Sequence, residues 1–266
     1  MKNKIFLILL AFFYVHLTSA QDLFTVIKVS GNIVIERTGS QLGIGTAFLQ
    51  NENLVFKVPD SRAAVINPQR GRFLLTSENL TEFKSSKSVF LPSAGKMSTR
   101  AMNMSSKSNL KDLFEGDFVI LNELKIIVDT TLYPLTDKEF LYISYEYNNK
   151  TVNKKLAFHS DTLVIKRNEL LTVGGREIAD PKIDQMKLIY LKEGEQYKST
   201  PVCSFTPVFP DPGTISAEIA VIIEKMSIKT YQEKLNEISA FIEEFYGTVD
   251  ENSLKKWLEK YLGLKQ

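Results

Sequence analysis

The sequence predicts an α+β protein with a small N-terminal β module, a central antiparallel β-sandwich-like module and a C-terminal helical tail. Three observations predict this fold class. Short runs rich in Val, Ile, Phe and Thr alternate with turn-forming residues through positions 25–76. Strand patterns return at a spacing of about ten residues between 112 and 210. After Gly213, apolar residues recur at helical spacing, which predicts two or three helices.

Residues 1–20 have the features of a secretory signal peptide. Lys2 and Lys4 precede an apolar run at 5–15, and small residues at 18–20 follow it. The apolar run is shorter than the roughly 20 residues that a membrane-spanning helix requires, although an uncleaved anchor is the alternative. No cysteine follows the expected cleavage site, which argues against a lipoprotein. We therefore expect a mature chain that begins at Gln21 and is periplasmic or secreted, without a stable membrane span.

The charge and cysteine content of the mature chain limit the classes of partner it can attract and the means by which its fold is stabilised. Removing residues 1–20 takes two lysines from the 33 basic residues and leaves 31, equal to the 31 acidic residues. A neutral chain has no general attraction to nucleic acid or to anionic membranes. Cys203 is the only cysteine, so no internal disulfide forms and the hydrophobic core must stabilise the fold. The 246 remaining residues and the 44% hydrophobic content suffice for two or three small modules.

The first module is expected over residues 21–82. Its predicted strands are 25–29, 33–35, 47–49, 54–58, 63–66 and 73–75. Turn-forming residues separate them, including Gly31-Asn32, Pro59-Asp60-Ser61 and the Gly71-Arg72-Phe73 segment.

These turns also carry a family resemblance. The order of a hydrophobic strand, Gly31-Asn32, a second strand, the segment 59–66 and then Gly71-Arg72-Phe73 resembles the periplasmic FecR-like sensor domain. The resemblance implies a small β fold, but the chain lacks the upstream cytoplasmic anti-sigma segment of that family's regulators, so a sigma-factor role is not implied. The whole chain also resembles a group of signal-peptide-bearing proteins of Gram-negative bacteria through its GRF turn, its SFTPVFPD segment and its helical tail. That second resemblance implies a shared architecture and no particular activity.

Residues 83–111 differ in composition from the rest of the chain. They contain several serines, three methionines without helical spacing and no acidic residue. One interpretation is a solvated linker. The other is a docking arm, in which flexible methionines and positive charge contact an acidic, apolar partner surface. The candidate partner-binding residues of this arm are Lys84, Lys87, Lys96, Arg100, Lys107 and Lys111.

The second β module is expected over residues 112–210. Its predicted strands are 118–121, 125–128, 140–147, 152–158, 163–165 and 186–191. Asn148-Asn149-Lys150, Gly174-Gly175 and Lys192-Glu193-Gly194 are hairpin signals. Four tyrosines in these strands are candidates for the floor of a sugar-binding surface, although such tyrosines are more often half-buried on a sheet. They are Tyr142, Tyr145, Tyr147 and Tyr190.

The end of this module and the tail are marked by prolines and helix caps. The four prolines between 201 and 213 predict an edge strand followed by a stiff connector, because each proline lacks a backbone donor. The helical region is expected over 211–266. Thr230 and Glu233 form a capping box, Gly247 ends that helix, and Thr248 with Glu251 repeats the capping pattern.

Residues suited to catalysis or metal binding are scarce. His159 is the only histidine after the signal peptide, and its neighbours Ser160 and Asp161 cannot converge with it as a triad, so the segment is interpreted as a turn. With no second His or Cys nearby, we expect neither zinc nor another metal. Gly43-Ile44-Gly45 is not a dinucleotide fingerprint, and no Walker sequence occurs, so no cofactor is expected.

Two functional hypotheses follow. The first is an exported, non-catalytic binding, sensing or assembly protein that acts through its β modules and basic linker on a protein partner in the cell envelope. The alternative is a secreted hydrolase, either carboxylate-based or dependent on Cys203 with His159 as base. The sequence does not separate them by any motif.

Overall fold

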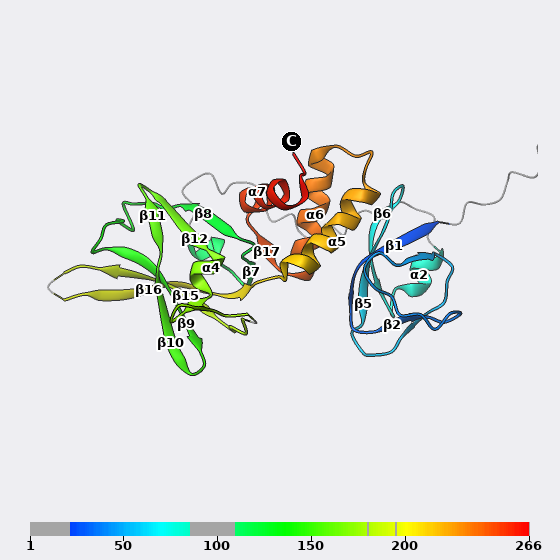
Figure 1. Ribbon diagram of the computed structural model, residues 1–266, viewed down its shortest axis with the longest axis horizontal. Helices are drawn as coiled ribbons and strands as arrows, with labels where there is room; N and C mark the ends of the chain where they lie inside the picture. The colour runs from blue at the N-terminus through cyan, green and yellow to red at the C-terminus, as the bar shows by residue number, and fades with distance from the viewer. Residues whose placement is uncertain (1–21, 86–109, 180, 195, 266) are drawn as a thin grey trace, which may run out of the picture. The chain divides into compact units, whose positions relative to one another are not determined.

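A computed structural model describes residues 22–85, 110–179, 181–194 and 196–265, which form two compact units (Figure 1). The first unit comprises the described residues up to Arg70 together with those from Leu74 to Ser85. The second comprises Gly71–Phe73 and the described residues from Leu110 onward. The predicted α+β class is confirmed, with β modules followed by C-terminal helices.

The first unit is a small β module with one helix. Its elements are β1 (Leu23–Ser30), β2 (Ile33–Ile35), β3 (Ala47–Leu49), β4 (Leu54–Phe56), β5 (Arg62–Asn67), the second half of β6 (Gly71–Thr76) and α2 (Leu80–Ser85). One sheet has the order β3-β1-β5-β6, and β2 pairs with β4 in a second sheet. Each predicted strand of this region corresponds to a strand of the structure, although β4 ends at Phe56 and leaves out positions 57 and 58 of the predicted strand 54–58.

The buried side chain of Ser61 accounts for the glycine and serine found in two turns of this module. The Ser61 hydroxyl accepts the backbone N–H of Asn32 at 3.1 Å and donates to the carbonyl of Val58 at 2.7 Å. Gly31 lies directly over it with φ of +84°, and a Cβ at that position would be 2.9 Å from the Ser61 Cα. The turn at 31–32 and the turn before β5 are therefore joined through one side chain, which requires Gly at one position and a small hydroxyl at the other.

Aromatic packing fixes α2 in the core of the first unit. Phe83 is 0% exposed, and its ring lies 4.8 Å from that of Phe24 and 6.2 Å from that of Phe48. Only the two ends of the predicted linker, 83–111, fall within the described residues. Phe83 belongs to α2 at one end and Leu110 to a short helix at the other, and both side chains are buried. These described ends are packed structure.

The second unit contains two main sheets, a two-stranded hairpin and the C-terminal helices. Its strands are β7 (Asp117–Val119), β8 (Glu123–Ile127), β9 (Phe140–Tyr147), β10 (Lys150–Lys155), β11 (Ala157–His159), β12 (Thr162–Lys166), β13 (Thr172–Val173), β14 (Arg176–Glu177), β15 (Met186–Lys192), β16 (Lys198–Val208) and β17 (Thr248–Val249). Its helices are α3 (Leu110–Leu113), α4 (Arg167–Leu170), α5 (Pro212–Lys225), α6 (Tyr231–Phe245) and α7 (Glu251–Leu262).

The two main sheets form the sandwich-like core. One has the order β10-β9-β15-β16-β7-β17 and the other β11-β12-β8, while β13 and β14 form a separate hairpin. Ile143, Met186 and Phe205 of the larger sheet share one buried cluster with Ile126 and Ile165 of the smaller. Strands β8, β9, β12 and β15 contribute alternate residues to this cluster, as the period of two in a half-buried strand requires, whereas the register shift in β16 interrupts the alternation there.

Two hairpins form where the sequence predicts them. Asn148 and Asn149 join β9 to β10 with φ of 51° and 59°, and Gly174 and Gly175 join β13 to β14 with φ of 58° and 78°. Positive φ at both central residues matches the right-handed twist of the flanking strands, and Asn and Gly tolerate this conformation best.

The prediction of an edge strand at the prolines is right for one part of β16 and wrong for the other. Among the described strands, residues 198–205 of β16 pair only with β15, whereas its last three residues also pair with β7 and are interior. Pro201 is tolerated because β7 reaches only Thr206–Val208, and because the register shifts between Leu188 and Ile189 beside it. On the β7 side the ladder uses the N–H of Thr206 and the carbonyl of Val208, so Pro207 is not required as a donor there. Each proline therefore lies where no ladder donor is needed.

The helical tail is confirmed, with one difference at its last cap. Asp211 caps α5 by accepting the backbone N–H of Thr214, and the Thr230–Glu233 capping box begins α6 as predicted. The cap of α7 is Asp250, which accepts the backbone N–H of Ser253, rather than Thr248. Thr248 cannot serve because it is paired with Phe118 in the parallel β17–β7 ladder. In the described residues, no helix is both long and apolar enough to cross a membrane.

Arg72, in the part of the GRF segment that belongs to the second unit, has a structural role there. Its guanidinium is 2% exposed and donates to the carboxylates of Glu237 and Glu244 on α6. A buried guanidinium requires such partners, because an unpaired buried charge is strongly destabilising.

Candidate binding surface

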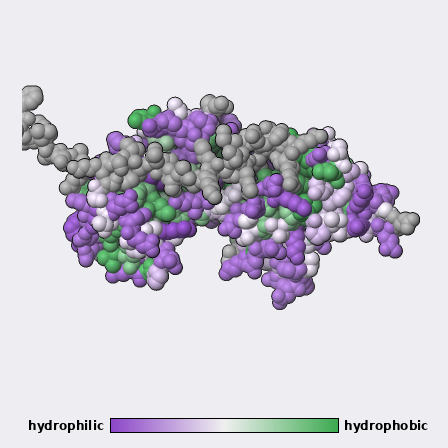
Figure 2. Space-filling view, turned by 180° about the vertical axis from the view of Figure 1, so that it is seen from behind, coloured by the Kyte–Doolittle hydropathy of each residue, from purple (hydrophilic) through white to green (hydrophobic). Residues whose placement is uncertain are grey.

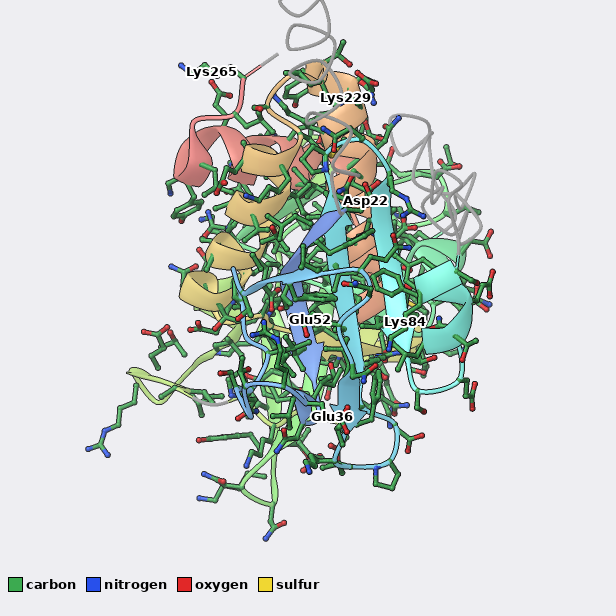
Figure 3. All side chains as sticks on the ribbon, turned by 90° about the vertical axis from the view of Figure 1, so that its right-hand side faces the viewer. Asp22, Glu36, Glu52, Lys84, Lys229 and Lys265 are labelled. Carbon is green, nitrogen blue, oxygen red and sulfur yellow. The ribbon has the colours of Figure 1, made fainter. Side chains whose placement is uncertain are left out.

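The predicted basic arm is described only at Lys84 and Lys111. Lys84 lies on α2, where its ammonium donates to Asn53 Oδ1 at 2.5 Å (Figure 3). Lys111 lies on α3, and its charge lowers the pKa of Cys203 against a larger opposing effect of burial. The other four basic residues, Lys87, Lys96, Arg100 and Lys107, lie outside the described residues. The docking-arm hypothesis therefore stays a prediction.

His159 lies in a hairpin turn, as the sequence predicts. It ends β11, Ser160 adopts φ of 56°, and Asp161 precedes β12. The Asp161 carboxylate accepts the hydroxyl of Thr162 at 3.2 Å, and His159 is exposed. The three adjacent residues thus form a turn and are not arranged as a triad.

Cys203 is a poor candidate for a nucleophile. It pairs with Leu188 across the β15–β16 ladder and packs against the core cluster. Burial raises the pKa of its thiol to about 11, with Lys111 opposing that shift. Since the thiolate is the reactive form, little of it exists near pH 7.

We expect Cys203→Ser to leave any function intact and to reduce the free energy of unfolding by at most about 1–3 kcal/mol, because it replaces a half-buried thiol with a hydroxyl. The wild-type thiol should also react slowly with iodoacetamide at neutral pH. Its raised pKa predicts that stability is present below about pH 9 and is lost as the pH rises towards 11, because only the unfolded chain ionises freely in that interval. Denaturant unfolding of both proteins across this pH range checks the expectation. A pH profile that Cys203→Ser leaves unchanged would contradict it.

The four tyrosines do not share a surface. Tyr145 is 3% exposed and donates its hydroxyl to the carbonyl of Leu170, and Tyr190 is 5% exposed and donates to the carbonyl of Pro134 at 3.0 Å. Burial, with a smaller effect of Tyr147, raises the pKa of Tyr145 to about 12. Tyr147 lies on the same core-facing side, and Tyr142 alone faces outward. The proposed sugar-binding floor of four tyrosines is therefore wrong, because strand alternation puts three of them on the core side.

The outward side of the six-stranded sheet is the most distinctive surface of the second unit. Its side chains lie in rows that run across β10, β9, β15 and β16, because residues paired across neighbouring strands project to the same face. One row contains Phe140, Leu191 and Ser199; the next contains Lys155, Tyr142, Ile189 and Pro201; and a third contains Asn153, Ser144, Lys187 and Ser204. All of these side chains are partly or fully exposed.

The first two rows form a contiguous apolar strip. We define the strip as Phe140, Tyr142, Ile189, Leu191 and Pro201, which are neighbours on β9, β15 and β16. The rings of Phe140 and Tyr142 lie 6.4 Å apart at 62°. Isolated apolar side chains are normal on protein surfaces, but a contiguous group with a polar rim is typical of a binding site.

Polar groups border the strip on both sides. The Lys155 ammonium lies 4.2 Å from the centre of the Phe140 ring and donates to the carbonyl of Asp137 at 3.3 Å. The Tyr142 hydroxyl donates to Ser199 Oγ at 3.2 Å. Lys187 lies two residues before Ile189 on β15 and on the same face, and within the described ranges neither Lys155 nor Lys187 forms an ion pair. The rim therefore has two ammonium groups that form no ion pair with a carboxylate of the described residues.

A pocket of about 260 Å³ adjoins this rim. Ser144, Glu146 and Lys187 of the sheet line it, together with the segment 182–185 before β15. Its walls carry both carboxylates and ammonium groups, so it suits a polar group of a larger ligand better than an apolar one. A second pocket, of about 420 Å³, lies in the first unit and is lined only by polar or charged residues, among them Asp60, Arg62 and Glu78.

The described residues contain no group of three His, Cys, Asp or Glu side chains that could hold a metal ion. Two of the five strip residues have a signal in the sequence, because the alternation in 140–147 separates Phe140 and Tyr142 from the core-facing residues. What the sequence does not show is that Ile189, Leu191 and Pro201 lie beside them. That depends on the register of three strands.

Comparisons with known proteins give no family for the chain. No protein-family model matches it, and no curated protein matches it closely enough to count as a relative. One solved structure, the crystal structure of the N-terminal four Ig domains of Dscam1 isoform 6.9, aligns with 11% identity and a TM-score of 0.18. The alignment covers 71% of this chain and 45% of that chain, so this chain spans less than half of its length. A likeness with this TM-score carries no argument about function.

Proposed function

We propose that this protein is an exported, non-catalytic binding or assembly module that recognises a protein partner of the cell envelope through the strip. The observation that carries the proposal is a contiguous group of two aromatic and three aliphatic side chains on one sheet face, of which Pro201 is exposed and the other four are partly exposed. Burying such side chains against a partner is favourable by about 25 cal/mol per Å² of apolar surface. Interfaces of this kind have an apolar centre and a polar rim, as the strip and its lysines and serines do.

The composition of the strip favours a protein over a glycan. Sugars stack on aromatic rings but present hydroxyls elsewhere, so they match Phe140 and Tyr142 and leave Ile189, Leu191 and Pro201 against polar groups. Apolar side chains of a protein can pack against both the aromatic and the aliphatic residues of the strip. The ammonium groups of Lys155 and Lys187 add a preference for a partner with carboxylates at the edge of its interface.

We also propose that the first unit is a FecR-like module of this binding protein. Support comes from the way the Gly31-Asn32 turn and Ser61 depend on one another, since these are the residues on which the resemblance rests. Export to the periplasm or beyond rests on the signal-like features of residues 1–20.

A photo-crosslinking experiment tests the role of the strip. A photoreactive phenylalanine analogue in place of Tyr142 should crosslink to a specific envelope protein in intact cells. The same analogue in place of Tyr261 on α7, which is 47% exposed, should not. Once the partner is purified, Tyr142→Ser and Leu191→Ser should each weaken binding by about tenfold or more, because truncating a central apolar contact commonly costs about 1–4 kcal/mol of binding free energy.

The matched control is Tyr261→Ser, which removes an exposed tyrosine from a helix and should leave binding unchanged. The thermal midpoint of each variant shows whether the fold is intact. Equal crosslinking from positions 142 and 261, or full binding by both strip variants, would rule out the strip as the interface.

A further inference from the structure

Among the described strands, none pairs with the outer edge of β10, which lies at the side of the strip. β10 is the outermost strand of the six-stranded sheet, and all six of its residues pair with β9 in one register without a bulge. The β9–β10 hairpin projects at the bottom of the second unit in Figure 1, and the corresponding projection in Figure 2 is hydrophilic. A regular, straight edge of this length is a template for a further strand.

The register shows which backbone groups are free. In an antiparallel pair, the N–H and C=O of one residue point to the same side, and successive residues alternate. The N–H of Leu156 donates to the carbonyl of Leu141 at 3.0 Å, so Val152 and Lys154, which have the same parity, also point towards β9. Thr151, Asn153 and Lys155 must then direct their N–H and C=O groups away from the sheet. These three residues also project their side chains onto the face that carries the strip.

The charge on this edge defines the kind of strand that would pair with it. β10 contains Lys150, Lys154 and Lys155 and no acidic residue. The ammonium of Lys154 donates to the carbonyl of Thr172, whereas Lys150 and Lys155 are exposed and have no ion pair within the described part of the chain. Edge lysines also prevent indiscriminate pairing, and they oppose pairing with a second copy of β10 because like charges would meet. An acidic strand removes that repulsion.

We propose that β10 accepts an extended, acidic segment of the partner as an additional antiparallel or parallel strand. The inference rests on the proposed function, since the added strand belongs to the protein that covers the strip. Backbone hydrogen bonds from Thr151, Asn153 and Lys155 supply affinity, and carboxylates opposite Lys150 and Lys155 supply selectivity. The segment binds beside β10 and leads the rest of the partner across Lys155 towards Tyr142.

A defined peptide tests this site without the natural partner. The probe is a fluorescein-labelled, C-terminally amidated octapeptide, Val-Glu-Glu-Val-Val-Glu-Glu-Val, with lysine in place of glutamate as the comparison. Its paired glutamates put carboxylates on both faces of an extended strand, because Lys150 and Lys155 project to opposite faces of β10. The acidic peptide should bind the full chain, and binding should weaken between about 25 and about 300 mM salt because exposed charges are screened. On binding, the amides of Thr151, Asn153 and Lys155 should become protected from hydrogen exchange, as resolved by NMR.

Two variants separate the backbone and charge contributions. Asn153→Pro removes an N–H that faces outward and leaves the ladder with β9 intact, so it should weaken peptide binding by about tenfold, or about 1.4 kcal/mol. Asn153→Ser keeps the N–H and should bind like the wild type. Lys150→Glu combined with Lys155→Glu does not disturb the backbone and should abolish binding of the acidic peptide while favouring the lysine peptide.

The inference fails if the three amides gain no protection, if both peptides bind equally, or if Asn153→Pro and the double variant both bind like the wild type. These outcomes are independent of the strip. Loss of partner binding in Tyr142→Ser with no peptide bound at β10 would support the proposed function and overturn the added strand. Protection of the β10 amides by the peptide, together with full partner binding by the strip variants, would support the added strand and overturn the proposed role of the strip.

Discussion

Gly247→Ala should destabilise the second unit by about 3 kcal/mol, because a side chain at this position has neither a permitted conformation nor space. Gly247 adopts φ of +113° between α6 and β17. A Cβ there would lie 2.5 Å from the carbonyl oxygen of Asp117 and 2.9 Å from its carbonyl carbon, both of which are backbone atoms of β7. The alanine must therefore push β17 away from β7 or move the end of α6.

The control for this variant is Gly174→Ala. Gly174 also has a positive φ, of +58°, but nothing lies within 4 Å of the place that a Cβ would occupy, so only the conformational cost of about 1 kcal/mol remains. Denaturant unfolding of both variants, followed by far-ultraviolet circular dichroism, gives the comparison. Equal losses would show that the close approach to Asp117 is not what requires glycine at position 247.

Phe83→Ala should destabilise the first unit by about 3–5 kcal/mol, the usual cost of removing a fully buried phenylalanine. Phe83 contacts Phe24 and Phe48, and its deletion leaves a cavity between α2 and the sheet. Hydrogen exchange of the amides in β1 and β5 measures the stability of this unit separately from that of the second.

Thr81→Ala is the matched control, because Thr81 is an exposed residue of the same helix and should change stability by less than about 0.5 kcal/mol. The comparison also tests whether the predicted linker 83–111 begins at Phe83. If Phe83→Ala lowered the free energy of unfolding as little as Thr81→Ala, Phe83 would behave as a solvated linker residue, as the composition of 83–111 suggested.

Local features of the fold are predictable from the sequence because they depend on neighbours along the chain. Asn148-Asn149 and Gly174-Gly175 predict hairpins because few other residues adopt positive φ at both positions. The Thr230–Glu233 capping box is equally local, since its hydrogen bonds join residues three apart. The turn at His159 is predictable for the same reason.

The errors concern residues whose role depends on distant partners. The prolines of β16 suggested an edge, but a strand is an edge only where its neighbours end, and β7 covers just the last three residues of β16. Thr248 has the composition of a cap, yet pairing with Phe118 commits it to β17, and Asp250 caps α7 instead. In each case a long-range pairing overrode a correct local preference.

The sequence by itself predicted most of the strands, the C-terminal helices, two hairpin turns and the scarcity of catalytic groups, but not α2, β17 or the division of 152–158 between β10 and β11. Only the tertiary structure decided which face of each strand is exposed and what lies beside it. The alternation of Phe140 to Tyr147 is visible in the sequence, but it has two possible orientations. Packing of Ile143 and Tyr145 into the core selects one, and the register of β15 and β16 then places Ile189 and Pro201 beside Tyr142. Because a shift of one residue would reverse every side chain, the binding surface exists only once that register is fixed.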